Sequence, residues 1–207
     1  MADTDSTPTP DAPPVRKRPK PGERRIQILQ ALAAMLELPG AERVTTAALA
    51  ARLQVSEAAL YRHFASKAQM FEGLIEFIET SVFSLLNQIT DGPHPPLDKA
   101  RRMITVLLQF AERNPGMARV MVGDALVFEN DRLHQRMNLF FDKVEASLRQ
   151  VLRDAAAAQS SATPSVDAQV QASLWVSFVV GRLQRFARSG YKRSPLEHLD
   201  ASLALLT

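Results

Sequence analysis

Apolar residues recur every three or four positions along most of this chain, and polar residues occupy the positions between them. From Glu23 onward this spacing fits the period of an α-helix, and no stretch alternates strictly in the manner of a half-buried strand. The pattern therefore predicts an all-α protein. Its first helix begins at Glu23 and ends before Pro39-Gly40, because these two residues interrupt helices. The apolar stripe of that helix comprises Ile26, Leu29, Leu32, Ala33 and Leu36.

A long helix is predicted to begin after Ser66 and to end at the Asp91-Gly92-Pro93 break. Ser66 and Gln69 have the spacing of a capping box, in which each side chain can bond a free amide at the helix start. Met70 and Phe77 lie about 100° from the centre of the apolar stripe, so something other than the main core is expected to cover them. That stripe comprises Phe71, Leu74, Ile75, Ile78, Val82, Leu85, Leu86 and Ile89.

The next helix, from Pro96 to Arg113, is apolar on nearly all sides, which is typical of a central helix. Beyond it the pattern predicts two short pieces and two long helices, the long ones separated by a polar loop. These lie at 117–122, 125–128, 133–152 and 166–188, with the loop at 155–164. The last two long helices have wide apolar faces that a monomer would leave exposed. We therefore expect a homodimer that pairs them in a four-helix arrangement.

Residues 1–22 are rich in proline, serine and threonine and predict a disordered, basic, proline-rich arm. The run Arg16-Lys17-Arg18-Pro19-Lys20 lies just before the first helix and permits two interpretations. It is either a solvated tail or an arm that reaches the minor groove or the backbone of DNA. The arm has no apolar core of the kind found in signal peptides, and no run reaches the ~20 apolar residues of a spanning helix. We expect a cytoplasmic protein without membrane contact.

Composition limits the chemistry that this chain can perform. Because it has no cysteine, it lacks disulfides, thiolate nucleophiles and cysteine-based metal sites. The glycine-rich phosphate-binding patterns are absent, and so are the H-E-x-x-H and G-x-S-x-G patterns of hydrolases. The four histidines are isolated in sequence, at His63, His94, His134 and His198. We expect no enzyme activity, no cofactor and no metal. A net charge of +3 is compatible with a polyanionic partner.

The segment from Thr45 to Phe64 has room for three short helical pieces with little linker. Thr45 and Ser56 are good N-caps, and the chain turns near Val55, which together predict a helix-turn-helix. In the second of its helices, Leu60 and Phe64 form the inner side. The outer side carries mostly small or polar residues, which suits a helix entering the major groove of DNA. These residues are Ser56, Glu57, Ala58, Ala59, Tyr61, Arg62 and His63.

Four side chains of this segment suit DNA phosphates: Thr45, Tyr61, His63 and Lys67. A lysine in the first turn of a helix opposes the helix dipole by about 0.3–1 kcal/mol, and a bound phosphate would reverse that penalty. Singly, each residue permits a plainer interpretation. Tyr61 could be a packed aromatic residue, His63 a surface histidine and Lys67 a solvated charge. Their joint occurrence favours DNA contact.

The motif V-S-E-A-A-L-Y-R-H-F-x-S-K, from Val55 to Lys67, resembles the DNA-binding signature of TetR-family regulators. Segments 70–79, 110–117 and 124–153 are similar to the nucleoid occlusion branch of that family. The resemblance implies a TetR-like fold, with a three-helix DNA-binding domain at 23–67 and a helical domain for dimerisation and partner binding at 68–207. It further implies a nucleoid-associated dimer that binds palindromic DNA, with more than one dimer able to share a site.

In that branch the DNA-bound protein engages the C-terminal tail of the division protein FtsZ and prevents Z-ring assembly over the nucleoid. Carried onto this chain, the tail-binding groove has Phe77 on one wall and Val106, Gln109, Arg113 and Asn114 on the other. Arg113 could neutralise an acidic peptide, or it could form a structural ion pair at the end of its helix.

Three residues depart from the pattern of the family. Gln54 occupies a turn position where glycine is usual, and a left-handed conformation there would cost about 1–2 kcal/mol. Leu85 and Gln109 stand where relatives carry basic and glycine-like residues, respectively. They affect the charge and depth of the implied groove.

Two other functions of a DNA-binding protein stay open at this point. A ligand-responsive repressor of the same family would keep an enclosed cavity of several hundred Å³ inside its second domain. A nonspecific DNA-coating protein would bind in a salt-dependent way without preferring a palindrome.

Overall fold

The computed structural model describes residues 22–38 and 44–206, and these residues form helices and connecting turns without a strand. The predicted all-α fold is confirmed. Of the proposed arm at residues 1–22, residues 1–21 lie outside the described residues. The α-helices, with one short 3₁₀ turn η1, are α1 Glu23–Leu36, α2 Thr46–Leu53, α3 Glu57–Tyr61, α4 Lys67–Asp91, α5 Pro96–Arg113, α6 Pro115–Met121, η1 Asp124–Leu126, α7 Asp131–Ala158, α8 Pro164–Arg188 and α9 Leu199–Leu205.

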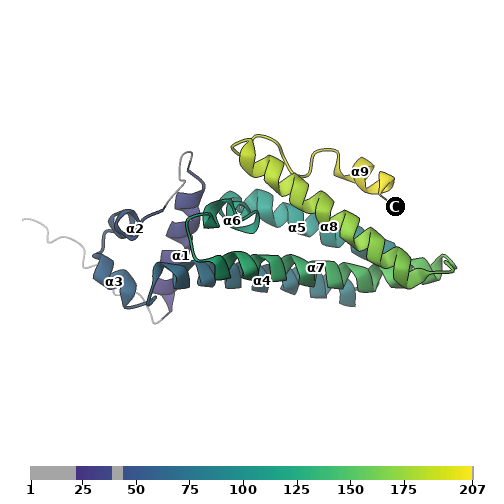
Figure 1. Ribbon diagram of the computed structural model, residues 1–207, viewed down its shortest axis with the longest axis horizontal. Helices are drawn as coiled ribbons and strands as arrows, with labels where there is room; N and C mark the ends of the chain where they lie inside the picture. Colours follow the sequence, from purple (N-terminus) through teal and green to yellow (C-terminus); the bar gives the residue numbers. More distant parts are fainter. Residues whose placement is uncertain (1–21, 39–43, 207) are drawn as a thin grey trace, which may run out of the picture.

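Figure 1 shows an elongated molecule in which α1, α2 and α3 gather at one end. The long helices α4, α5, α7 and α8 run away from that end, with α7 and α8 packed on one another. None of the helices within residues 22–38 and 44–206 combines the length and the apolar character that a membrane crossing requires.

The ends of several helices differ from the prediction. Residues 45–64 form two helices rather than three, because the turns at 54–56 and 62–66 occupy the remaining residues. Helix α7 continues through Ala158 into the predicted polar loop, since alanine has the highest helix propensity. The predicted piece 125–128 is instead η1, and Val127 and Phe128 are exposed. Helix α9 was not predicted, because it is short and its N-cap, His198, provides no side-chain hydrogen bond.

The buried face of α1 matches the predicted stripe at Leu32, Ala33 and Leu36 but includes Ile28 instead of Ile26. Ile28, Leu32 and Leu36 are buried at a spacing of four residues, and Ala33 lies beside them. Ile26 was expected in the core but is exposed. At about 100° per residue, Ile26 points about 140° away from the direction midway between Ile28 and Leu32, so it faces away from them.

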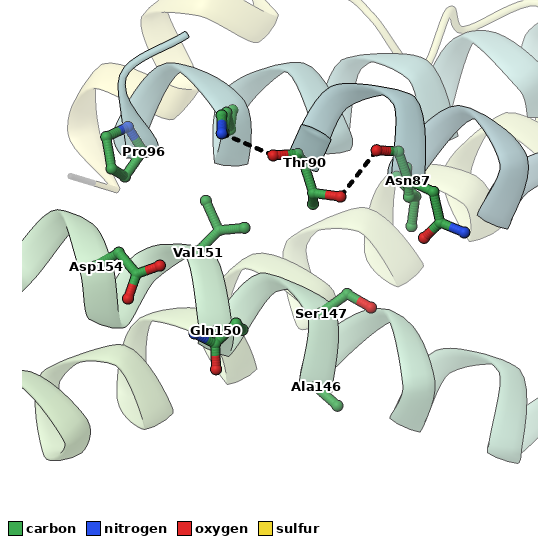
Figure 2. A pocket seen from close by; sticks show the side chains of 10 residues that line it. Asn87, Thr90, Pro96, Ala146, Ser147, Gln150, Val151 and Asp154 are labelled. Carbon is green, nitrogen blue, oxygen red and sulfur yellow. Dashed lines mark hydrogen bonds between the residues drawn. The ribbon is translucent and has the colours of Figure 1, made fainter. Parts of the chain in front are cut away.

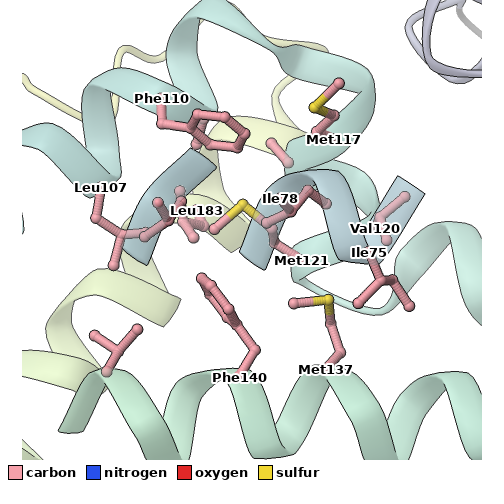
Figure 3. Packing of buried hydrophobic residues seen from close by; sticks show 14 of the residues in the cluster. Ile75, Ile78, Leu107, Phe110, Met117, Val120, Met121, Met137, Phe140 and Leu183 are labelled. Carbon is pink, nitrogen blue, oxygen red and sulfur yellow. The ribbon is translucent and has the colours of Figure 1, made fainter. Parts of the chain in front are cut away.

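The core continues without interruption from α1 through the long helices. Figure 3 shows its central part, where Phe140 and Met137 of α7 point toward Ile78 of α4 and Met121 of α6. Helix α5 is buried on several sides, as predicted, because α4, α6, α7 and α8 all pack against it.

Met70 and Phe77, the two large residues off the α4 stripe, have different surroundings. Met70 is buried, whereas Phe77 is 50% exposed. Between them, a Cβ atom at Gly73 would lie 3.3 Å from side-chain atoms of Leu29 and Phe64. The N-terminal helices therefore cover the first turns of α4 on this side. Phe77, one turn further along, extends beyond their cover.

The C-terminal end of α1 is held tightly against α6. A Cβ atom at Gly116 would lie 2.1 Å from the carbonyl oxygen of Ala33, so only glycine allows this approach. The Leu36 carbonyl accepts two hydrogen bonds, from Nη1 of Arg119 at 3.1 Å and from Oη of Tyr191 at 3.2 Å. Partial burial raises the pKa of Tyr191, which keeps its hydroxyl a donor. These contacts fix the orientation of α1 on the rest of the molecule.

Candidate DNA-binding and partner-binding surfaces

Side-chain caps begin both helices of the helix-turn-helix. The Ala48 amide donates to Oγ1 of Thr45 at 3.1 Å, and the Ala59 amide donates to Oγ of Ser56 at 3.3 Å. Oγ1 of Thr46 in turn donates to Glu57 at 2.6 Å, which links α2 to the start of α3. The local sequence therefore sets the angle between the two helices.

The turn between α2 and α3 contains Gln54 in the left-handed conformation, with φ 55° and ψ 46°. Its amide donates to Ala51 and the Val55 amide donates to Ala50, so the turn ends α2 with paired carbonyls. Gln54 thus adopts the left-handed conformation that glycine favours, although it is not a glycine. A side chain here carries about 1–2 kcal/mol of strain.

Replacing Gln54 with glycine is expected to stabilise the protein by about 1 kcal/mol, because glycine adopts this conformation without strain. The midpoint of thermal unfolding should rise by about 2–4 °C. Gln135→Gly is the matched control, since Gln135 lies exposed inside α7, where glycine costs about 1 kcal/mol. Equal destabilisation of the two variants in urea unfolding would disprove the strain at Gln54.

Helix α3 has the predicted inner and outer sides. Leu60 and Phe64 are buried, while Tyr61 is 44% exposed, so it is not a packed core residue. The remaining candidate DNA-contacting residues are exposed, except for Ala59, His63 and Lys67, which are partly buried. The exposed ones are Thr45, Ser56, Glu57, Ala58 and Arg62.

Arg25 of α1 holds the end of α3, and nothing in the local sequence pattern indicated this role. Its Nη1 donates to the His63 carbonyl, and its guanidinium lies 4.1 Å from the ring centroid of Phe64. His63 is therefore positioned through its backbone.

Lys67 is neither solvated nor free. Its Nζ forms an ion pair with Glu129, from the turn before α7, and lies 5.6 Å from the ring centroid of Phe71. The two charged side chains are 23% and 10% exposed. Glu129 thus offsets the unfavourable position of a cation in the first turn of α4. Glu129 could not be predicted as the partner of Lys67, because the two residues are 62 positions apart in the sequence.

One side of α4 faces α7 and is acidic. Arg136 of α7 donates to Oε2 of Glu79 at 2.6 Å and to the Glu72 carbonyl at 3.3 Å. The hydrogen bond that Arg136 donates to the Glu79 carboxylate raises the pKa of Arg136. Phe77 lies more than a quarter turn from these glutamates, on the opposite flank of the helix.

The other candidate groove residues lie on α5 and at its end. Helices α4 and α5 pack as antiparallel neighbours joined by residues 92–95. Phe77 lies 14 residues before the end of α4 and Gln109 lies 13 residues after the start of α5, so the two are at nearly the same height. Val106 and Gln109 are both partly buried.

At the end of α5, Arg113 is exposed and makes no ion pair with any residue in the described ranges. The alternative of a structural ion pair for Arg113 therefore finds no support. Asn114, which joins α5 to α6, is partly buried and donates from Nδ2 to the Phe110 carbonyl at 2.7 Å.

Comparison with known proteins decides the family. Residues 96–207 match the family SlmA-like_C, described as "Tetracyclin repressor-like, C-terminal domain", and residues 28–74 match TetR_N, "Bacterial regulatory proteins, tetR family". The nucleoid occlusion factor SlmA of Idiomarina loihiensis is 51% identical over 86% of this chain and 90% of its own. SlmA of Vibrio cholerae is 51% identical over 89% of this chain and 94% of its own. The chain belongs to the SlmA family of nucleoid occlusion factors.

Solved structures of other regulators share the fold of this chain. FadR from Bacillus subtilis, solved with stearoyl-CoA, has a TM-score of 0.72 at 15% identity and covers 87% of this chain and 96% of its own. A TetR/AcrR-family regulator from Thermobifida fusca has a TM-score of 0.68 at 16% identity, and the match covers 89% of this chain and 97% of the regulator. At such identities the likeness shows the TetR-like fold alone. Membership of the SlmA family makes this chain a DNA-binding regulator and not an enzyme.

The interior of this SlmA-family chain is packed with apolar side chains, including Trp175, Phe140 and Phe71. Two crevices, of about 510 and 540 Å³, open to solvent instead of lying enclosed. Figure 2 shows the first, between the end of α4, the start of α5 and α7. There the ammonium of Lys99 already donates to the Thr90 carbonyl at 2.7 Å. These features give little support to a ligand-responsive repressor.

Groups of three acidic or histidine side chains able to hold a metal ion do not occur among residues 22–38 and 44–206.

Proposed function

We propose that this chain binds palindromic DNA as a homodimer through α3 and, when bound, engages the C-terminal tail of FtsZ through α4 and α5. It thereby antagonises Z-ring assembly over the nucleoid. One observation carries the proposal. Two aromatic side chains are exposed on separate surfaces of a chain that has one continuous core. Tyr61 is exposed on the recognition helix, and Phe77 is exposed on α4 beyond the cover of the N-terminal helices.

For DNA, α3 enters the major groove, and the two caps and the Arg25 contact hold it at a fixed angle. Thr45, Tyr61 and His63 bond phosphates, and Lys67 does so where a phosphate displaces Glu129. The small residues of α3 allow a close approach to the bases. We assign this role to a domain of residues 23–67. The remaining helices, within 68–207, dimerise and bind the partner protein.

For dimerisation, α8 carries a row of exposed apolar residues, Val166, Val170 and Leu174, at a spacing of four residues. Leu139 on the neighbouring α7 is exposed too. Such a patch is unusual on a monomer, and pairing α7 and α8 with those of a second copy would bury it.

Replacing Glu129 with glutamine is expected to strengthen DNA binding, because it releases Lys67 for a phosphate. The affinity should rise a few fold at low salt, and the slope of log K against log salt should steepen by about one. Fluorescence titration of a palindromic duplex at several salt concentrations measures both quantities.

Asp131→Asn is the matched control, since Asp131 is a nearby exposed carboxylate at the start of α7. It should leave the slope unchanged. If Glu129→Gln behaves like the control, Lys67 does not contact a phosphate.

The division function is tested by sedimenting FtsZ filaments with the protein and either a palindromic or a scrambled duplex. The proposal expects the palindromic duplex to reduce the pelleted FtsZ and the scrambled duplex to have little effect. Tyr61→Ala should lose this activity together with DNA binding. Equal filament loss with both duplexes would favour a nonspecific DNA-coating protein, and no loss with either would favour a plain repressor.

A further inference from the structure

Helix α5 carries one row of residues that the core does not use. Arg102, Val106, Gln109 and Arg113 follow one another at spacings of four, three and four residues, so they share one face. The two arginines are exposed, and the two residues between them are partly buried. Neither arginine forms a hydrogen bond or ion pair with any residue of the described ranges. With a rise of 1.5 Å per residue, the arginines lie about 16 Å apart.

Helix α4 carries exposed apolar side chains at the same heights as this row. Phe77 is at the height of Gln109, and Leu85, which is also exposed, lies six residues before the end of α4. Arg102 lies six residues after the start of α5, so Leu85 and Arg102 are at about the same height. The face therefore has an apolar middle and a cation near each end.

Neighbouring carboxylates do not cancel these charges. The glutamates of α4, Glu72, Glu76 and Glu79, lie on the side that faces Arg136 of α7. Glu112 of α5 accepts a hydrogen bond from Ser194. Asp98, one turn before Arg102, is exposed on the same flank and would repel a carboxylate placed beyond Arg102.

We propose that Arg102 is a second anchor of the partner-binding face, opposite Arg113. The peptide that fits this face has an apolar centre and carboxylates near both ends, about 16 Å apart. Asp98 then fixes the register by excluding an acidic residue beyond the Arg102 end. This inference rests on the proposed function, in which the occupant is the FtsZ tail.

The test measures the affinity of a fluorescent FtsZ tail peptide for the full-length protein bound to palindromic DNA. Arg102→Gln and Arg113→Gln should each weaken binding about two- to fivefold, the range of an exposed ion pair. Lys143→Gln is the charge-matched control and should have no effect, since Lys143 is exposed on α7, which carries none of the proposed groove residues.

Peptides in which each carboxylate is neutralised in turn, as Asn, Gln or a terminal amide, identify the partners. Neutralising one carboxylate should remove the sensitivity to Arg102→Gln, and neutralising a different one should remove the sensitivity to Arg113→Gln. Such cycles isolate each pair from general effects of charge.

The outcomes separate this inference from the proposed function. If the wild-type protein fails to bind the peptide, the proposed function is wrong and the inference fails with it. If the wild-type protein binds and Arg102→Gln binds equally well, only the role of Arg102 is wrong. A loss of DNA affinity in Arg102→Gln as large as the loss of peptide affinity would make Arg102 a DNA contact and would also overturn the inference.

Discussion

Replacing Gly116 with alanine is expected to destabilise the protein by about 2–3 kcal/mol and to weaken DNA binding. The new Cβ atom would lie 2.1 Å from the carbonyl oxygen of Ala33, and a backbone atom cannot move aside as a flexible side chain can. Overpacking of this kind typically costs 1–3 kcal/mol. Since α6 holds α1 at this point, the displacement would also change the position of the recognition helix. Urea unfolding and duplex titration measure the two effects.

Gly73→Ala is the matched control for that experiment. It also lies against the N-terminal helices, but its new Cβ atom would meet only side-chain atoms of Leu29 and Phe64, at 3.3 Å. Alanine also gains about 1 kcal/mol over glycine inside a helix, so the net change should be small. If the two variants have equal stability and equal DNA affinity, the contact between α1 and α6 does not fix the N-terminal helices.

Replacing Phe77 with alanine is expected to lower the affinity for the FtsZ tail about thirtyfold, the effect of losing an aromatic anchor worth about 2 kcal/mol. DNA affinity should stay within about twofold of the wild type, because Phe77 lies outside the helix-turn-helix. Stability should change little, since the side chain is half exposed and lies off the core stripe. Peptide titration, duplex titration and urea unfolding on the same samples give the three values.

Phe128→Ala is the control, because Phe128 is an aromatic residue at least as exposed as Phe77 but lies in the turn before α7. It should bind the tail as the wild type does. Equal losses in both variants, or a parallel loss of DNA binding and tail binding in Phe77→Ala, would contradict a dedicated groove on α4 and α5.

The sequence predicted those parts of the fold that local chemistry controls. The start of α4 follows from the Ser66 cap, whose hydroxyl accepts the Gln69 amide at 3.2 Å, and its end follows from Gly92-Pro93. The two-sided character of α3 follows from spacing alone. The sequence predicted only that Phe77 and Met70 both lie off the apolar stripe of α4. It could not predict that Phe77 is exposed while Met70 is buried.

The contacts that the sequence could not give are those between distant segments. Lys67 and Glu129 are 62 residues apart, and Tyr191 bonds Leu36 across 155 residues. Ile26 was misplaced because an apolar residue in the first turn of a helix fits the stripe as well as Ile28 does, and only the position of the neighbouring helices distinguishes them.

The coupling that we propose between DNA binding and partner binding would act through the contact between α1 and α6. Arg113 and Asn114 end α5, and the chain continues directly into Pro115 and Gly116, which pack on α1. A shift of α1 when α3 binds DNA would therefore act on one end of the groove. By thermodynamic linkage, tail binding would then strengthen DNA binding by the same factor.

The most direct test is the titration of a fluorescent FtsZ tail peptide with the full-length protein, with and without a palindromic duplex. The account predicts that the duplex tightens peptide binding at least about fivefold, and that Tyr61→Ala removes this gain while leaving the DNA-free affinity unchanged. An affinity that is the same with and without the duplex, or the absence of peptide binding in both cases, would contradict it.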